Sequence, residues 1–254
     1  MARLDLDGVA RQFEGVQAVE GLTMTALPAR ITGLIGPNGA GKTTVVNLIS
    51  GLLKLSAGRI QLDGRDISTL QPDQVARLGV ARTFQNVRLL KEASVVDNVV
   101  VGFHMHDRTS LAAQALGLPS VRRSRKASIE RARELLSEFE MSEYAQLLAG
   151  ELSYGHQRRV EIMRALATEP KVLLLDEPAA GMNDVEAHAL GTIFRRLADR
   201  GLTILLIEHN MELVMALCDE LYVLDSGKLI ASGSPAQVQS HPAVIEAYLG
   251  AELC

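Results

Sequence analysis

Short apolar runs of strand length recur along the chain, and between them apolar residues return with helical spacing. The first such pair is RITGLIG at 30–36, followed by KTTVVNLISGLL at 42–53. Later in the chain, apolar runs at 171–178 and 202–209 lie on either side of an amphipathic segment at 184–200. Strands that are apolar on both faces and alternate with helices predict a mainly parallel sheet covered on both sides.

Two further segments have the pattern of antiparallel strands. They are RIQLDG at 59–64 and LYVLDSGKLIASG at 221–233, where DSG predicts the turn of a hairpin. Between about residues 86 and 154 helical spacing replaces the strand pattern, in ASVVDNVVVG, TSLAAQALG and ASIERARELLSEFEM. We therefore expect an α/β core with an antiparallel β subdomain and an inserted helical subdomain.

Composition narrows the class of protein. The chain has 254 residues, 47% of them hydrophobic and 22% charged, which is enough to bury a substantial core. No apolar run approaches the roughly 18–20 residues that cross a bilayer, and two aspartates in MARLDLDGV argue against a signal peptide. Two cysteines without metal-ligand spacing fit a reducing compartment. We therefore expect a cytoplasmic protein with no membrane span.

The charge balance argues against nucleic acid as a partner. The net charge is −4, only 4% of the residues are aromatic, and Trp is absent. A dedicated nucleic-acid binder usually has a basic face or an aromatic stacking platform.

The glycine-rich segment GPNGAGKTT lies between a predicted strand and a predicted helix. It matches the phosphate-binding pattern G-x-x-x-x-G-K-[ST], and the alternative of a turn with an incidental lysine does not explain this context. Its backbone N–H groups and the helix N-terminus would hold an anion, while Lys42 would reach the β- and γ-phosphates and Thr43 would ligate Mg²⁺. The predicted phosphate-contacting residues are Gly36, Pro37, Asn38, Gly39, Ala40, Gly41, Lys42, Thr43 and Thr44.

Two carboxylates end the later apolar run VLLLDE. Asp176 can hold Mg²⁺ through its water shell, and Glu177 can polarise an attacking water. The alternative is a strand that ends in an acidic turn. The upstream glycine loop favours the catalytic interpretation.

A second phosphate-binding helix start is suggested by LSYGHQRR at 152–159, where Ser153 and Gly155 precede the helical run QRRVEIMRALAT. The order of the glycine loop, Gln85, LSYGHQ, LLLDE and His209 closely resembles the ATP-binding cassette (ABC) family over nearly the whole chain. The resemblance implies a P-loop NTPase fold in one ATP-binding domain, with a nucleotide-binding core at 1–86 and 155–254 and an inserted helical subdomain at 87–154.

The resemblance also implies roles for individual residues. Gln85 would sense Mg²⁺ and the attacking water, and His209 would contact the γ-phosphate as a catalytic switch. Phe13 would stack on adenine. Ser153 and Gly155 would contact ATP bound to a second cassette, so the functional unit would be a dimer. The structural alternatives are a polar strand end for Gln85, a structural histidine, core packing for Phe13 and a helix cap for Ser153.

The sequence departs from the family pattern at three positions. In the signature, which usually reads LSGGQ, Tyr154 replaces the first glycine and His156 replaces the glutamine. Asn183 stands where an aspartate is typical. The resemblance implies that these three positions contribute to contacts across the dimer. Activity is still expected, because the changes leave intact Lys42, Asp176, Glu177 and His209.

The phrases ARTFQNVRLL, DEPAAGMN and GSPAQVQSHPAVIEAYLG resemble the ATPase subunits of branched-chain amino-acid importers, and related importers of urea or short amides share much of this pattern. The resemblance implies an ATPase that binds two Mg·ATP with itself or a paralogue and drives a separate membrane permease. It would lie peripherally at the inner face of the membrane, with a periplasmic binding protein as an indirect partner.

The alternative from another class is a soluble ABC ATPase that works without a membrane partner. Such proteins often carry two cassettes or a long coiled-coil insertion, whereas this chain has one cassette and a modest insert. A basic run at 122–133 is most simply a solvated helix face, with contact to a membrane subunit or anionic lipid as the second interpretation.

Overall fold

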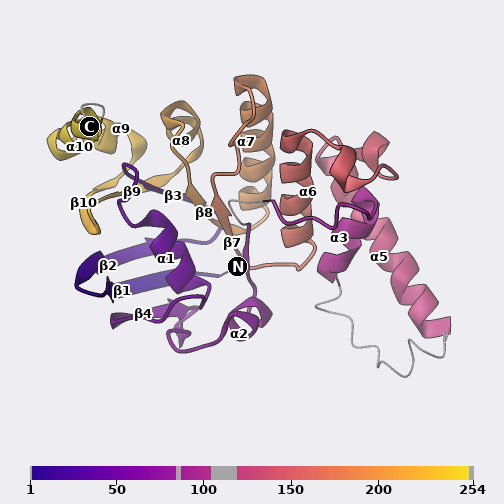
Figure 1. The fold of residues 1–254 in the computed structure, drawn as a ribbon, viewed down its shortest axis with the longest axis horizontal. Coiled ribbons are helices and arrows are strands. Elements are labelled where there is room, and N and C mark those ends of the chain that lie inside the picture. Colours follow the sequence, from indigo (N-terminus) through magenta and orange to yellow (C-terminus); the bar gives the residue numbers. More distant parts are fainter. Residues whose placement is uncertain (1, 84–86, 104–118, 252–254) are drawn as a thin grey trace. The chain divides into compact units, whose positions relative to one another are not determined.

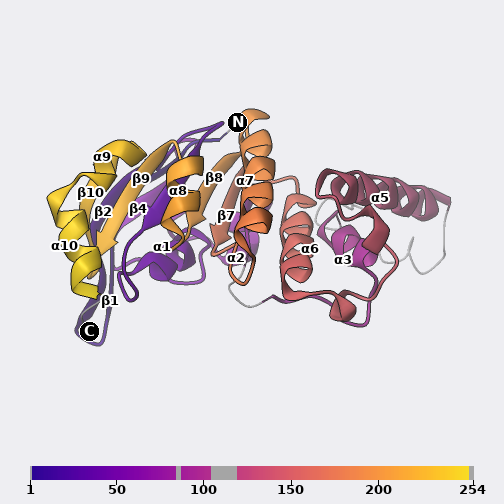
Figure 2. The same cartoon turned by 90° about the horizontal axis from the view of Figure 1, so that it is seen from above.

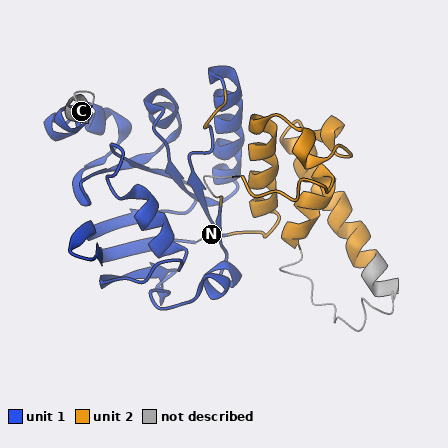
Figure 3. Ribbon diagram, viewed as in Figure 1, with its two compact units in different colours: residues 1–82, 171–179, 183–254 blue, residues 83–170, 180–182 orange. Residues whose placement is uncertain are grey.

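The computed structural model describes residues 2–83, 87–103 and 119–251. Two compact units make up the chain (Figure 3). Unit 1 comprises Met1–Arg82, Lys171–Ala179 and Asn183–Cys254, and unit 2 comprises Thr83–Pro170 and Ala180–Met182. The chain therefore leaves unit 1, forms unit 2 and returns.

Unit 1 is built on a six-stranded sheet with the order β10-β9-β3-β8-β7-β6, in which β10 is antiparallel to β9 and the other neighbours are parallel. Every residue of β3, β7 and β8 is buried, as the continuous apolar runs predict. The bounds are β3 Ile31–Ile35, β6 Val80–Arg82, β7 Val172–Asp176, β8 Thr203–Ile207, β9 Glu220–Asp225 and β10 Lys228–Gly233.

A second, antiparallel sheet in unit 1 has the order β2-β1-β4-β5. Its strands are β1 Leu4–Phe13, β2 Val16–Ala26, β4 Ala57–Leu62 and β5 Arg65–Asp66. The pairing of β1 with β2 shifts register three times, and left-handed glycines lie in both strands at Gly8 and Gly21. These irregularities interrupt the two-residue alternation that identifies a strand in a sequence.

Helices cover the parallel sheet of unit 1. Figures 1 and 2 show α7 (Asp184–Asp199) and α8 (Met211–Leu217) on one face and α1 (Lys42–Ile49) on the other. Val45 and Val46 of α1 are buried in one cluster with leucines of both sheets, including Leu6 and Leu174. The remaining helices are α2 Pro72–Arg77, α9 Pro235–Gln239 and α10 Pro242–Ala251.

Unit 2 is helical in the part that the structure describes. Its helices are α3 Val95–Phe103, α5 Pro119–Glu138, η2 Ser142–Tyr144, η3 Ala149–Glu151 and α6 Tyr154–Leu166, and α3 packs on both α5 and α6. The predicted helical segment TSLAAQALG lies outside the described residues. Together the two units have the predicted α/β fold with flanking helices, an antiparallel β sheet and a helical insertion.

Unit 2 continues to Pro170 and includes α6. The physical reason is that α6 packs against α3 within this unit. In the described part of the chain, no helix is both long and apolar enough to cross a membrane.

Candidate functional site

Residues 36–41 connect the central strand β3 to α1. Gly36 has φ +146°, and a Cβ there would lie 2.0 Å from the backbone oxygen of Leu224 in β9. Gly41 has φ +100°, and a Cβ there would lie 2.3 Å from the backbone oxygen of Ala18 in β2. Any side chain at these positions would collide with main chain, so the loop can take this shape only with glycine.

Lys42 lies at the first helical position after the loop and turns back over it. Its Nζ donates hydrogen bonds to the carbonyl oxygens of Gly36 at 2.6 Å and Pro37 at 2.8 Å. Burial lowers the pKa of Lys42 below its ordinary value, and the charges of Glu177 and Asp176 offset only part of this shift. The cation is therefore held at the loop by acceptors that a phosphate oxygen can replace.

The other predicted loop residues differ in access. Asn38, Gly39 and Thr43 are exposed, Pro37 and Thr44 are partly buried, and Ala40 is buried. The backbone oxygen of Ala40 accepts a hydrogen bond from Gly227 N–H at 3.1 Å, so the β9–β10 turn holds the loop at Ala40.

Asp176 ends β7 and is 2% exposed. Its Oδ2 accepts a hydrogen bond from Arg82 Nη2 at 3.1 Å, and Arg82 Nη1 donates to Asn47 Oδ1 of α1 at 2.5 Å. Arg82 ends the neighbouring strand β6, and burial lowers its pKa. The arginine therefore fixes the orientation of the carboxylate and links the ends of β6 and β7 to α1.

Sequence reasoning missed Arg82. The signal in the sequence was an arginine at the end of the short apolar segment GVAR, directly before the residues TFQ. In the structure, the two residues that precede Arg82 are buried.

Glu177 follows Asp176 and has φ +49°, a left-handed conformation that is uncommon for a residue with a side chain. Its N–H donates to the carbonyl oxygen of Ile207 in β8 at 2.9 Å, which extends the parallel pairing by one residue. Its Oε1 lies 3.9 Å from Nδ1 of His209, whose side chain is 66% exposed. The two residues predicted to act on water and on the γ-phosphate therefore lie side by side.

Phe13 ends β1 and is 37% exposed. The guanidinium of Arg11 lies 4.3 Å from the centre of its ring. A cation thus covers one face of an accessible aromatic ring, and the ring is not a core residue. Gln85 lies outside the described residues.

The signature residues belong to unit 2. Ser153 is exposed and caps α6, with Oγ accepting from the N–H of His156 at 3.4 Å. The ring of Tyr154 lies 3.1 Å from the point where a Cβ on Gly181 would be, and the ring of His156 packs against that of Tyr144 at a tilt of 41°, with ring centres 4.6 Å apart. Both departures from the usual signature therefore make packing contacts within unit 2. Gly155 faces Met182, whose Cγ lies 3.5 Å from the position of a Cβ.

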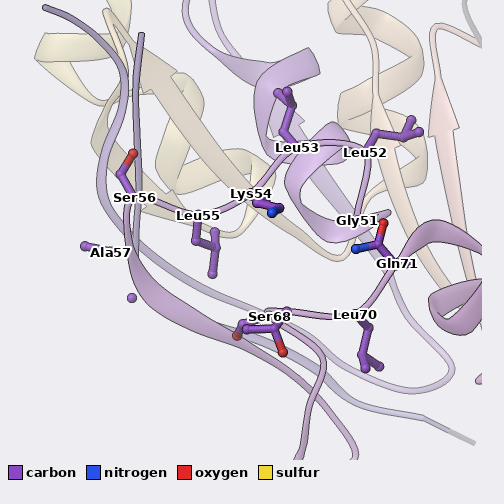
Figure 4. A pocket seen from close by; sticks show the side chains of 12 residues that line it. Gly51, Leu52, Leu53, Lys54, Leu55, Ser56, Ala57, Ser68, Leu70 and Gln71 are labelled. Atoms are coloured by element: carbon purple, nitrogen blue, oxygen red, sulfur yellow. The ribbon is translucent and has the colours of Figure 1, made fainter.

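A separate pocket of about 440 Å³ is lined by residues 51–58 and 68–71 (Figure 4). It lies beyond the C-terminal end of α1, whereas the glycine loop precedes the N-terminal end of that helix. The pocket contains none of the predicted site residues.

Comparisons with protein families give two matches. A family model described as ABC transporter matches residues 19–180. A second, described as branched-chain amino acid ATP-binding cassette transporter, matches residues 228–253.

Curated relatives cover almost the whole chain. The chain is 43% identical over 248 residues to the high-affinity branched-chain amino acid transport ATP-binding proteins BraF of Pseudomonas aeruginosa and LivG of Escherichia coli K12, with 97% of each chain covered. It is 35% identical over 250 residues to the lipopolysaccharide export system ATP-binding protein LptB of Escherichia coli K12, with 98% of each chain covered.

Solved structures agree with the fold. The chain is similar to a nucleotide-free ATP-binding cassette from an ABC transporter, with a TM-score of 0.85, 33% identity, and 98% of this chain and 99% of the other covered. It is also similar to cbiO1 of Clostridium perfringens, part of the transporter complex cbiONQ, with a TM-score of 0.80, 25% identity, and 97% and 94% covered.

Proposed function

This chain belongs to the ABC transporter family and is an ATP-binding cassette with the ATPase domain of that family, and we propose that it powers the import of branched-chain amino acids. The cargo proposal is supported by the match of residues 228–253 to the branched-chain amino acid cassette model. The lower identity to the lipopolysaccharide exporter subunit favours import over export.

The hydrolytic mechanism is supported by the position of Glu177, whose charge acts on Lys42 and whose Oε1 lies 3.9 Å from Nδ1 of His209, near the carboxyl ends of β7 and β8. Backbone N–H groups of residues 36–44 would hold the phosphates, and Lys42 would exchange its loop carbonyls for β- and γ-phosphate oxygens. Phe13 would offer its open face to adenine. The carboxyl edge of a parallel sheet is where α/β proteins bind their ligands.

Mg²⁺ fits the oxygen donors of this site. The exposed residue Thr43, through its hydroxyl, and the hydrogen-bonded carboxylate of Asp176 would hold it, together with Gln85 and with phosphate and water oxygens. Among the described residues, no group of three His, Cys, Asp or Glu side chains could hold a metal without such help. When bound, Mg²⁺ neutralises charge on the phosphates.

Hydrolysis would use Glu177 as the proton acceptor. The oxygen of water would attack the γ-phosphorus while its proton passes to the Glu177 carboxylate, and the bond between the γ-phosphorus and the bridging oxygen would break, giving ADP and phosphate. His209, whose Nδ1 lies 3.9 Å from Glu177 Oε1, would contact the γ-phosphate and orient it relative to the Glu177 carboxylate.

The working assembly would be a dimer with a second copy or a paralogue. Ser153 and Gly155 of one subunit would contact the ATP held by the other, so each site would need both chains. The dimer would lie at the inner face of the membrane, bound to permease subunits, with a periplasmic binding protein as an indirect partner.

The cargo is tested by uptake of labelled leucine, urea and acetamide in cells that lack this gene and carry either the wild-type chain or Glu177→Gln. We expect the wild type, and not the variant, to restore leucine uptake alone. Restored uptake of urea or acetamide instead would assign a different cargo. Unchanged uptake of all three, by a protein that hydrolyses ATP, would favour a cassette without a transport role.

A further inference from the structure

Glu208 is a buried carboxylate that lies outside the motifs of the sequence. It follows the last residue of β8, directly before His209, and its side chain is 1% exposed. Keeping a carboxylate away from water costs free energy unless hydrogen bonds replace the lost hydration. Packing alone therefore does not account for a carboxylate at this buried position.

The two oxygens of Glu208 accept backbone hydrogen bonds from two different segments. Oε1 accepts from the N–H of Ala179, which follows β7, at 2.8 Å, and Oε2 accepts from the N–H of His209, which follows β8, at 3.2 Å. Burial raises the pKa of Glu208 above its ordinary value. These N–H groups, the charge of His209 and the N–H of Asn210 offset only part of that shift. One side chain thus joins the segment after β7 to the segment after β8.

The segment held through Ala179 is the one that carries Glu177. The near end of this segment is fixed by the bond from Glu177 N–H to Ile207. Pro178 has no N–H, so the N–H of Ala179 is the next backbone donor along the chain. Glu177 keeps a left-handed φ, which persists only where the surroundings determine the backbone. Glu208 supplies that constraint at the far end of the turn.

The same side chain also lies against His209. Nδ1 of His209 is 3.8 Å from Glu208 Oε2 and 3.9 Å from Glu177 Oε1. We propose that Glu208 is a positioning residue, which sets the separation between the Glu177 carboxylate and the His209 imidazole. This inference rests on the proposed roles of those two residues in ATP hydrolysis.

Asp219 offers a matched control in the same unit. Its Oδ2 accepts a backbone hydrogen bond from Ile31 N–H at 2.8 Å and pairs with Arg195 Nη2 at 3.0 Å. It directly precedes β9 and contacts the first residue of β3, so it lies at the amino ends of these parallel strands, whereas the glycine loop follows the carboxyl end of β3. Asp219→Asn therefore measures the effect of weakening a hydrogen bond between a carboxylate and the backbone at a place remote from Glu177 and His209.

The experiment compares the full-length wild type with Glu208→Gln, Glu208→Asp and Asp219→Asn. Melting temperature, ATP affinity by calorimetry, kcat and KM are measured for each. Glu208→Gln keeps the size of the side chain but can place an amide donor where a backbone N–H already points. We expect its kcat to fall by about tenfold or more, since small displacements of catalytic groups are costly, while the Kd for ATP stays within about threefold of wild type. Asp219→Asn should keep kcat within about twofold.

A double variant shows whether Glu208 acts through Glu177. In a Glu177→Gln background, Glu208→Gln should cause little further loss of kcat, because residues that act as a unit are not additive. Glu208→Asp retains the charge and should recover part of the loss seen with Glu208→Gln. If Glu208→Gln does not fold, Glu208→Asp is compared with the wild type in its place.

Three outcomes would overturn the inference. They are a folded Glu208→Gln protein with wild-type kcat, a fall in kcat matched by an equal loss of ATP affinity, and an equal fall in Asp219→Asn. Failure of the proposed function looks different, because then the wild type does not hydrolyse ATP or Glu177→Gln hydrolyses it at the wild-type rate.

Discussion

Lys42 is the residue that nucleotide affinity is expected to depend on most. Lys42→Ala should remove most of the affinity for ATP, because a triphosphate in the loop would lose its nearest cation. Calorimetry with ATP measures the change. Lys54→Ala is the control, because Lys54 belongs to the pocket beyond α1 and not to the loop. Unchanged binding by Lys42→Ala would contradict the assignment.

The buried thiol of Cys218 leads to a prediction about its reactivity at a given pH. Burial raises the pKa of its thiol to about 12, so at pH 8 only about one molecule in 10⁴ carries the reactive thiolate. Iodoacetamide should therefore leave Cys218 unmodified in the folded protein and alkylate it after denaturation. Mass spectrometry of tryptic peptides measures the labelling. Rapid labelling of native Cys218 at pH 8 would show that the thiol is accessible.

At the residue scale, motif spacing identified the residues that we propose contact phosphate, because G-x-x-x-x-G-K-[ST] requires glycine where a side chain would collide with the main chain. It did not predict Arg82 or Glu208. Their roles arise from contacts with Asp176, Asn47 and Ala179, which are far away in the sequence and become neighbours only when the strands align.

At the scale of elements, the helix α7 shows how one departure from the family pattern is accommodated. Asn183 caps this helix, with its Oδ1 accepting from Glu186 N–H at 2.9 Å and its own N–H donating to Glu186 Oε2 at 3.1 Å. Asparagine and aspartate are equally good at such positions. The substitution therefore preserves the start of the helix that follows β7.

Asn183→Ala should lower the free energy of unfolding by about 1 kcal/mol, because the capping bond to the Glu186 N–H is lost. Chemical denaturation measures the change. Asn183→Asp is the matched control and should keep the cap, with a small gain from the helix dipole. Equal losses in both variants would show that capping is not what this residue contributes.

Continuous apolar runs made β3, β7 and β8 predictable, since buried parallel strands have no polar face. The long strands β1 and β2 gave no comparable signal, because their register shifts break the alternation of apolar residues. The extent of the helical unit also depends on packing, since α6 follows the signature in sequence and packs on α3 in space.

At the scale of the whole molecule, the sequence predicted the class of fold but not the order of strands. The central position of β3 between β9 and β8 pairs residues near 32 with residues near 205 and 220. That order is decided by how crossovers pack, and no local pattern encodes it.

The proposed dimer should be visible in a variant that binds ATP without turning it over. In Glu177→Gln, turnover should fall by about 10²–10⁴-fold while ATP stays bound, and bound ATP shifts the population toward the closed dimer. Size-exclusion chromatography with ATP should show more dimer than for wild type. Adding Lys42→Ala should abolish the difference. A monomer at every ATP concentration would contradict the shared site.

The left-handed backbone of Glu177 has a consequence for protein engineering. Glycine and asparagine adopt this φ with less strain than glutamate, so replacing Glu177 by either would relieve a local cost. If Glu177 has the proposed role, a variant library ranked by thermostability alone would therefore enrich Gly or Asn at position 177 and accumulate stable proteins that hydrolyse ATP slowly. Selection of improved cassettes has to score turnover together with melting temperature, because at this position the two select for different residues.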